Sequence, residues 1–108
     1  MTPADEAPLG QELVLANDQV RVWLDVIAPG EAQPLHTHRS AYLSLTLTPA
    51  HAEVLEADGT KRYDVNRAAG EVTWFGPDQV PNTHTMRNVG GAEIRVAVIE
   101  VLTPPRPD

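Results

Sequence analysis

Four histidines are the residues whose spacing could support chemistry in this 108-residue chain. His36 and His38 are separated by one residue, and His84 lies far along the sequence. Alternate residues of a strand point to the same face, so the first two imidazoles would lie side by side. Two imidazoles on one face can coordinate a divalent metal ion, although such a pair also occurs on exposed strand ends. The prediction of a metal site therefore depends on the surrounding sequence.

The composition limits what else the chain can do. It has no cysteine, so disulfides, thiolate nucleophiles and zinc-thiolate clusters are excluded, and a metal ion must be held by nitrogen or oxygen. Neither Ser40 nor Ser44 lies in a Gly-x-Ser-x-Gly turn, which argues against a serine hydrolase. His51 follows a turn and matches no motif position, so we expect it at the surface. The catalytic residues, if any, are not identified by these patterns.

Charge argues against two classes of partner. Asp and Glu number 15 against 8 Lys and Arg, for a net charge of -7. The electrostatic field of so negative a chain repels phosphate backbones and anionic lipids, so we expect no binding to nucleic acid or membranes. No apolar run approaches the ~18 residues of a membrane span, and the first residues do not resemble a signal peptide. We expect a cytoplasmic protein.

The elements that must position the histidines are predicted to be strands. Apolar and polar residues alternate over 20–26, 42–47 and 94–98, and the weaker pattern at 50–57 is also assigned to a strand despite its helix propensity. Arg21, Arg87 and Arg95 alternate with apolar neighbours and are expected to point into solvent.

Glycines and prolines predict how these strands connect. Pro29-Gly30 fits the centre of a type II turn, Asp58-Gly59 fits a two-residue hairpin, and Gly90-Gly91 predicts another hairpin. Seven or eight short strands indicate an all-β fold, a closed or sandwiched antiparallel barrel. We assign residues 1–10 and 103–108 to tails and 11–102 to one domain.

Two segments resemble the sequence motifs of the cupin superfamily. Its first motif reads Gly-x5-His-x-His-x3-4-Glu-x6-Gly, and Gly30, His36 and His38 match it through both histidines. Its second motif reads Gly-x5-Pro-x-Gly-x2-His-x3-Asn, and His84 and Asn88 match its final part, after a loop that is longer here. The chain resembles a small single-domain cupin.

The resemblance implies a conical jelly-roll β-barrel with a metal ion near one mouth. Carried over residue by residue, the ligands would be His36, His38 and His84. The motif's glutamate does not carry over, because Tyr42 and Leu43 stand where it would be. Three arrangements remain open: a three-histidine site completed by water, a site that Tyr42 joins through its phenol oxygen, and a barrel without metal.

The missing carboxylate affects the expected ligand. An ion held by neutral imidazoles keeps about two positive charges, so we expect it to bind a small anionic molecule. Fe, Mn, Ni, Co, Cu and Zn all suit this ligand set. The leading hypothesis is a metal-dependent dioxygenase, isomerase or decarboxylase, and the alternative is a non-catalytic binding module for metal or small molecules. Tyr42 and Met86 are candidate lining residues, and exposed strand edges predict a homodimer.

Overall fold

The alternating segments form nine strands and one short 3-10 helix in the computed structural model, which describes residues 9–102. The strands are β1 (Glu12–Ala16), β2 (Val20–Ile27), β3 (His36–His38), β4 (Tyr42–Thr46), β5 (Ala50–Leu55), β6 (Lys61–Arg67), β7 (Val72–Phe75), β8 (Asn82–Asn88) and β9 (Ile94–Val101). The 3-10 helix, η1, spans Pro77–Gln79. The predicted all-β fold class is confirmed, and the ambiguous segment beginning at Ala50 is a strand.

The predicted tails lie mostly outside the described residues, namely at 1–8 and 103–108. Leu9 and Gly10, which were assigned to the first tail, are described. Leu9 is buried, and Gly10 lies against the backbone of β2. The packing onto β2 thus already includes Gly10, one residue before position 11.

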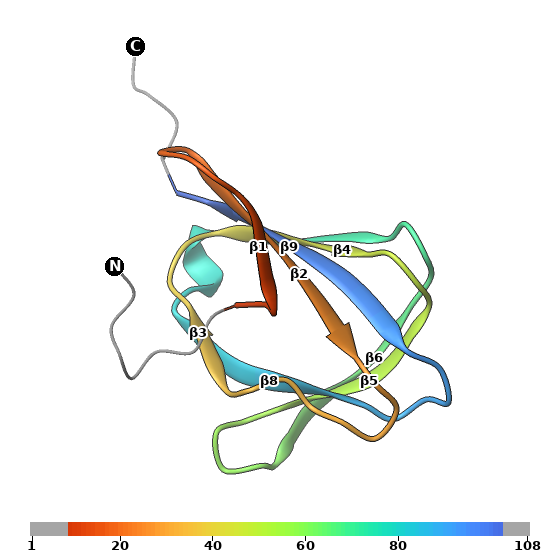
Figure 1. The fold of residues 1–108 in the computed structure, drawn as a ribbon. Coiled ribbons are helices and arrows are strands. Elements are labelled where there is room, and N and C mark those ends of the chain that lie inside the picture. Colours follow the sequence, from red (N-terminus) through yellow and green to blue (C-terminus); the bar gives the residue numbers. More distant parts are fainter. Residues whose placement is uncertain (1–8, 103–108) are drawn as a thin grey trace.

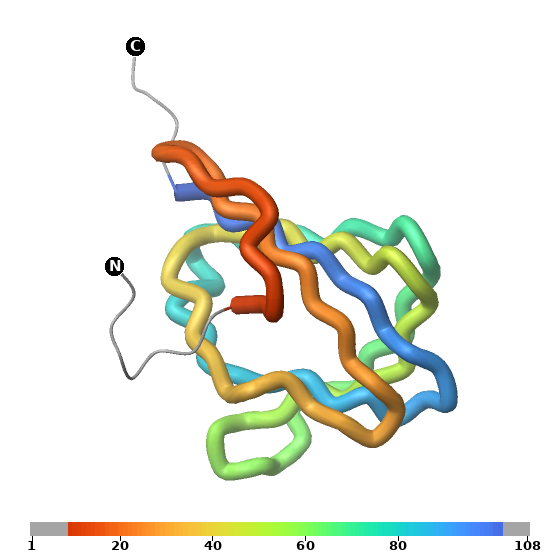
Figure 2. Tube along the Cα trace, in the orientation of Figure 1, coloured from red at the N-terminus to blue at the C-terminus, as the bar shows by residue number. Residues whose placement is uncertain are grey.

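The strands pair in two antiparallel sheets (Figure 1). One has the order β1-β2-β9-β4-β7 and the other the order β3-β8-β5-β6. Figure 2 shows the red and orange strands β1 and β2 running beside the blue strand β9, so the two ends of the described chain share one sheet. Strands β3 and β8, which carry the three motif histidines, are neighbours in the other sheet. The polypeptide must therefore cross between sheets several times.

Two of the predicted turns are present. At Pro29-Gly30 the amide of Glu31 donates to the carbonyl of Ala28 at 3.0 Å, and Gly30 has φ of 82°, as a type II turn requires. Asp58-Gly59 does join a hairpin, between β5 and β6. The predicted two-residue loop is wrong, however, because the loop also includes Ala57. A two-residue loop of type I′ needs positive φ at both residues, and in this loop only Gly59 has a positive φ.

The predicted hairpin at Gly90-Gly91 is wrong. Strand β8 pairs with β3 and β5, whereas β9 pairs with β2 and β4, so these glycines lie in a crossing between sheets. Asn88 holds the crossing together. Its fully buried amide donates to the carbonyls of Ile27 and Ala92 and its Oδ1 accepts from the amide of Gly90.

The space between the sheets is apolar at one end and polar at the other. A core of aliphatic side chains fills the apolar end: Ile27, Ala50, Ala52, Val54, Val65 and Ile94, with Met86 packed against it. Strand β4 instead buries Tyr42, Ser44 and Thr46 and leaves Leu43 and Leu45 half-buried on its other face. The alternating leucines of this strand therefore lie on the outer face of the sheet, and its polar residues face the interior.

Arg21 is 40% exposed, as a solvated arginine would be, but it also pairs with a buried carboxylate, which was not expected. Glu100 is buried and accepts from Nε of Arg21 at 3.0 Å and from Nε1 of Trp23 at 2.7 Å. A buried charge without such partners would be costly. The other two arginines of that prediction, Arg87 and Arg95, are exposed as expected.

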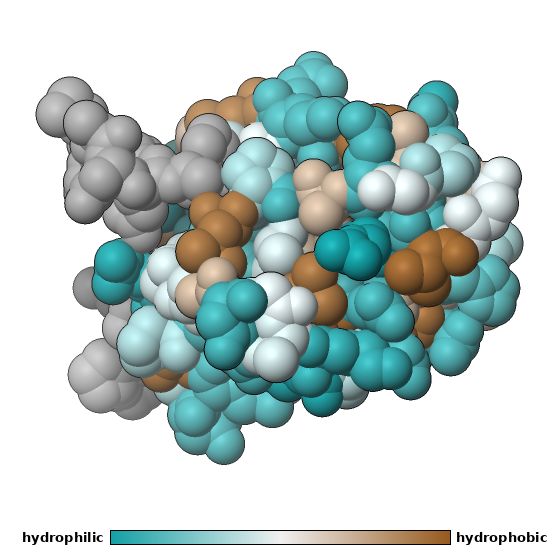
Figure 3. All heavy atoms as spheres, turned by 90° about the horizontal axis from the view of Figure 1, so that it is seen from below, coloured by the Kyte–Doolittle hydropathy of each residue, from teal (hydrophilic) through white to brown (hydrophobic). Residues whose placement is uncertain are grey.

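The two sheets have different outer faces. The side of β5, β6 and β8, seen from below in Figure 3, is mostly hydrophilic. On the five-stranded sheet the outward positions are mainly apolar, and Val72 and Trp74 remain 56% and 52% exposed. Within residues 9–102, no helix is long and apolar enough to cross a bilayer.

Candidate metal centre

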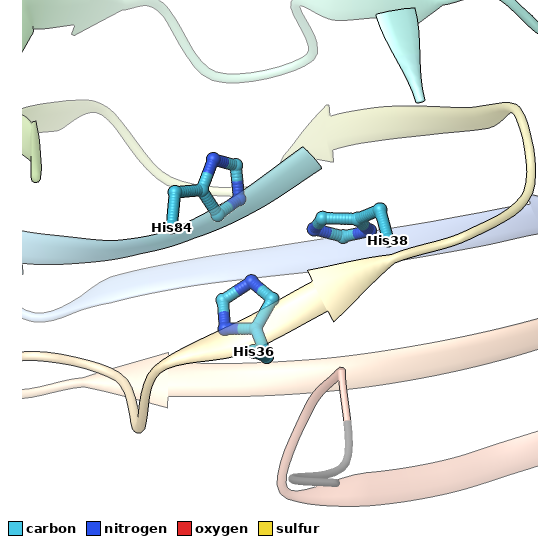
Figure 4. A group of neighbouring side chains, drawn as sticks. All are labelled: His36, His38 and His84. Carbon is cyan, nitrogen blue, oxygen red and sulfur yellow. The ribbon is translucent and has the colours of Figure 1, made fainter. Parts of the chain in front are cut away.

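The pairing of β3 with β8 brings the three motif histidines together. His36 lies directly opposite His84 in the strand register, and His38 follows two residues later on the same face. The three ring centroids are 4.9 to 5.0 Å from one another. In each ring the nitrogen farther from the backbone points toward the space between the rings (Figure 4). The predicted convergence of histidines from two distant segments is present, with donor atoms within 4.8 Å of one another.

Burial keeps these imidazoles neutral. The three rings are 2% to 8% exposed. Loss of solvation, reinforced by the nearby His36 ring, lowers the pKa of His38 to about 2 and that of His84 to about 3. Burial also lowers the pKa of His36, although its hydrogen bond to Pro34 acts in the opposite direction. A neutral imidazole is the form that binds a metal ion.

Hydrogen bonding fixes one ring and leaves two nitrogens without partners. Nδ1 of His36 donates to the carbonyl of Pro34 at 2.8 Å, which leaves Nε2 with its lone pair free. Nδ1 of His38 and Nδ1 of His84 are buried without a hydrogen-bond partner in the described part of the chain. Each such atom costs about 1–3 kcal/mol, a cost that native proteins usually accept only where a site has a function.

The donor set fits a first-row divalent transition metal. Two nitrogens bonded to one ion at ~2.1 Å are at most ~4.2 Å apart. The 4.8 Å limit on the donor atoms here exceeds that value only slightly, which small side-chain rotations can close. Three neutral imidazoles on one side leave further coordination positions for water or a ligand. The residues present therefore suit the metal that the sequence resemblance implies.

Tyr42 occupies the position of the missing glutamate without acting as an anion. Its ring is stacked on His38, with centroids 3.8 Å apart, and on Phe75 at 4.5 Å. Its hydroxyl accepts a hydrogen bond from Nδ2 of Asn82 at 3.1 Å. Burial raises the pKa of the phenol to about 12, despite that hydrogen bond. Tyr42 is thus a neutral phenol whose ring supports His38, which favours the arrangement with three histidines and water.

A network that the sequence did not predict holds Asn82 in place. Arg62 donates to Oδ1 of Asn82 at 2.6 Å and to the carbonyl of Thr83 at 2.9 Å. The same guanidinium pairs with both carboxylate oxygens of Glu56. These contacts connect the phenol of Tyr42 to a surface ion pair. No motif includes Arg62 or Asn82, so only the structure reveals them.

A pocket of about 420 Å³, its open mouth included, adjoins the three rings. Both predicted lining residues, Tyr42 and Met86, contribute to its wall. Gln33, Tyr63 and Arg67 also line it and were not predicted. Tyr63 and Arg67 lie on the same face of β6 as the buried Val65, but this single buried residue is too weak a signal to predict them from the sequence. His51 lies elsewhere, exposed on β5 and hydrogen-bonded to Asn66 at 2.6 Å, as predicted.

Comparison with solved structures identifies the architecture. A cupin domain protein from Bordetella pertussis superposes with a TM-score of 0.72 at 18% identity, over 83% of this chain and 88% of that one. The chain has the cupin fold. An RmlC-like cupin from Methanocaldococcus jannaschii gives 0.63 at 15% identity, over 94% and 86% of the two chains. The predicted cupin jelly roll is therefore confirmed.

Enzymes are also among the structures with a fold similar to that of this chain. A cupin superfamily sugar phosphate isomerase from Silicibacter pomeroyi has a TM-score of 0.55 at 20% identity, covering 80% of this chain and 52% of the isomerase. No family profile and no curated protein matches the sequence. These similarities therefore concern the fold.

Proposed function

We propose that this cupin domain binds one divalent transition metal through His36, His38 and His84 and is a metal-dependent enzyme acting on a small anionic molecule. The observation that carries the proposal is the convergence of three buried, neutral imidazoles on one space. A bound ion would act as a Lewis acid or would activate oxygen. Dioxygenase, isomerase and decarboxylase reactions are consistent with this chemistry, and a fold by itself does not choose among them.

The charge of the pocket supports an anionic substrate. Three neutral nitrogen donors leave the charge of a divalent ion uncompensated. No aspartate or glutamate is among the described residues that line the pocket. An incoming carboxylate or similar oxygen group would supply the missing negative charge. A nearby carboxylate, that of buried Asp25, lies behind the pocket wall, where Gln33 donates to it, and acts on His36 only through its charge. The lack of a carboxylate in the lining itself therefore favours substrates that bring one.

The residues around the histidines orient the rings and exclude water. The carbonyl of Pro34 holds His36 with Nε2 free, and the ring of Tyr42 restricts the rotation of His38. Such supporting contacts keep ligand side chains in one orientation. The side chains of Val54, Met86 and Val98 form an apolar wall beside them. The part of a small molecule that lies against these residues would be removed from water, which strengthens its electrostatic interactions there.

A specific observation supports a second candidate, a non-catalytic module that captures a metal ion or a small molecule. General acid-base catalysis works best with a group whose pKa is near the operating pH. Burial moves the pKa of Tyr42 upward and those of His38 and His84 downward, away from neutrality. The pocket then lacks an evident proton-transfer group, and binding without turnover would follow.

Elemental analysis of metal-loaded protein without an affinity tag tests the metal function. We expect about one ion per chain in the wild type, a strong reduction in His38→Gln and His84→Gln, and no change in the control His51→Gln, whose ring is exposed. Turnover and oxygen uptake are then assayed with Fe(II), Mn(II) and Ni(II) across a panel of small acids. Stoichiometry far below one ion per wild-type chain would refute the proposal. Metal binding with no turnover for any acid would favour the binding module.

We also propose that the partner protein is a second copy of this chain. The outer face of the five-stranded sheet has apolar side chains at Leu43, Leu45, Val72 and Trp74. Monomeric proteins rarely expose a large contiguous apolar patch. Since a chain with a net charge of -7 repels its own copies, we expect them to meet on such an uncharged face.

A further inference from the structure

Arg67 is a cation in the pocket wall that has no partner of its own. Its side chain makes no hydrogen bond and no ion pair with the described residues 9–102, although the chain has 15 acidic residues. Three other arginines each pair with a carboxylate, namely Arg21 with Glu100, Arg62 with Glu56 and Arg95 with Glu93. Arg87 also lacks such a partner among the described residues, but it is exposed to solvent, whereas Arg67 is half-buried in the pocket wall. A ligand in the pocket is therefore the group that could pair with Arg67.

The strand register explains why Arg67 faces the histidines. It is the last residue of β6 and lies opposite Ala50 of β5, which is buried. Val65, two residues earlier on the same face of β6, is buried in the core. Arg67 is half-buried and lines the same pocket as His36, His38 and His84. Its positive charge adds to the effect of burial in lowering the pKa of His84 and opposes the effect of burial in raising that of Tyr42, as expected for a guanidinium close to both.

The chemistry of the pocket then specifies two positions for an anionic ligand. Arginine presents a planar fork of N–H donors that matches the two oxygens of a carboxylate. The histidines would present an ion with open positions on the other side. No carboxylate of the described residues lines the pocket to neutralise either group. A ligand with two oxygen-bearing groups could satisfy both positions at once.

We propose that Arg67 binds the carboxylate of a small organic acid whose second oxygen group faces the three histidines. The second half of this inference rests on the proposed metal function, whereas the first half does not. The substrate class is thereby narrowed to short acids with a carboxylate and a second oxygen donor, such as dicarboxylates, 2-oxo acids or 2-hydroxy acids. Neutral analogues would be rejected, because they leave the guanidinium desolvated and without a partner.

Isothermal titration calorimetry with malonate tests the role of Arg67. Acetate, neutral malonamide and inorganic phosphate serve as comparison ligands, and the protein is used both metal-free and loaded with Co(II). The variants are Arg67→Gln, which removes the charge, and Arg67→Lys, which keeps the charge without the fork. Arg87→Gln is the matched control, because Arg87 is exposed and does not line the pocket. Metal content and thermal stability of every variant are measured in parallel.

We expect the wild type to bind malonate in both forms and more tightly with Co(II), with acetate weaker and malonamide undetected. Arg67→Gln should lose roughly tenfold or more in malonate affinity in both forms. Arg67→Lys should recover part of this loss, and Arg87→Gln should match the wild type. Metal content should be the same in all four proteins.

Several results would overturn the assignment. These are unchanged malonate affinity in Arg67→Gln, an equal loss in Arg87→Gln, and binding of phosphate with no binding of any carboxylate. A wild type that binds none of the anions would also overturn it. If instead the chain binds no Co(II) but Arg67→Gln still weakens malonate binding, the metal function fails and the carboxylate contact of Arg67 stands.

Discussion

Tyr42 lies flat against His38, with ring centroids 3.8 Å apart and an angle of 11° between the ring planes. The cupin motif that His36 and His38 match has a glutamate at about the position of Tyr42, so an aromatic ring stands where an anionic ligand would be expected. The Tyr42 ring packs against the face of the His38 imidazole and restricts its rotation, and a neutral phenol adds no charge to the site. On the proposed metal function, this difference from the motif is the reason why we expect a ligand to bring negative charge to the pocket.

The stack leads to a prediction for Tyr42→Phe. The substituted ring can still lie on His38, so we expect one metal ion per chain to remain bound. The lost hydroxyl leaves the amide of Asn82 without its acceptor, which should lower the free energy of unfolding by about 1 kcal/mol. Elemental analysis and urea denaturation measure the two effects. Loss of the metal in Tyr42→Phe would instead identify the phenol oxygen as a ligand.

The buried imidazoles predict an acid-sensitive fold in the metal-free protein. His38 and His84 have folded-state pKa values of about 2 and 3, whereas the unfolded chain binds protons near pH 6.5. Between these limits the unfolded state takes up more protons, so stability falls as the pH is lowered from about 6.5. Two such groups contribute a loss on the order of 4 kcal/mol by pH 5.

Denaturant unfolding of the chelator-treated protein at pH 8, 6 and 5 measures this loss. A double variant, His38→Gln with His84→Gln, should show a much weaker pH dependence, and His51→Gln should behave as the wild type. In the folded protein the rings of His38 and His84 stay neutral at pH 5, so we expect acid to release a bound metal through unfolding. An identical pH dependence in the wild type and the double variant would contradict this account.

Asn88 should be important for stability without contributing to the site. Its side chain is fully buried and provides hydrogen bonds to the backbone at Ile27, Gly90 and Ala92. Asn88→Ala leaves these groups without partners, and we expect a loss of roughly 2–4 kcal/mol in the free energy of unfolding. Urea denaturation gives the value. A loss below about 0.5 kcal/mol would mean that water replaces the amide in these contacts.

The apolar face of the five-stranded sheet predicts a dimer. Light scattering on a sizing column should give about twice the 11.7 kDa of one chain. Trp74→Glu places a charge on this face and should yield monomers. Val89→Glu is a matched control, because Val89 is also 52% exposed but lies in the crossing between β8 and β9. A wild type with the mass of one chain, or dissociation in the control alone, would contradict the prediction.

Much of this fold could be predicted from local patterns. Alternation over short segments identified the strands at Val20–Ile27 and Tyr42–Thr46, and His-x-His spacing placed two imidazoles on one face. Pairing between strands depends on residues far apart in the sequence, which local patterns do not reveal. The glycine pair Gly90-Gly91 therefore predicts a hairpin, whereas Asn88 anchors a crossing between the two sheets at this point.

The polar character of the interior was harder to predict. Burial of Ser44, Thr46 and Glu100 depends on partners from other strands, such as the Arg21 guanidinium that pairs with Glu100. Arg67 was missed for a similar reason. Its strand has exposed polar residues at most positions, and the one inward apolar residue, Val65, gives too little alternation to recognise.

The central claim is that His36, His38 and His84 hold one metal ion together. Anomalous diffraction at the absorption edge of the bound metal, on crystals of the Co(II)-loaded protein, tests it most directly. We predict one strong peak per chain at ~2.1 Å from a ring nitrogen of each of the three histidines. A peak on other residues, or no peak in fully loaded crystals, would show that the three imidazoles are not a metal site.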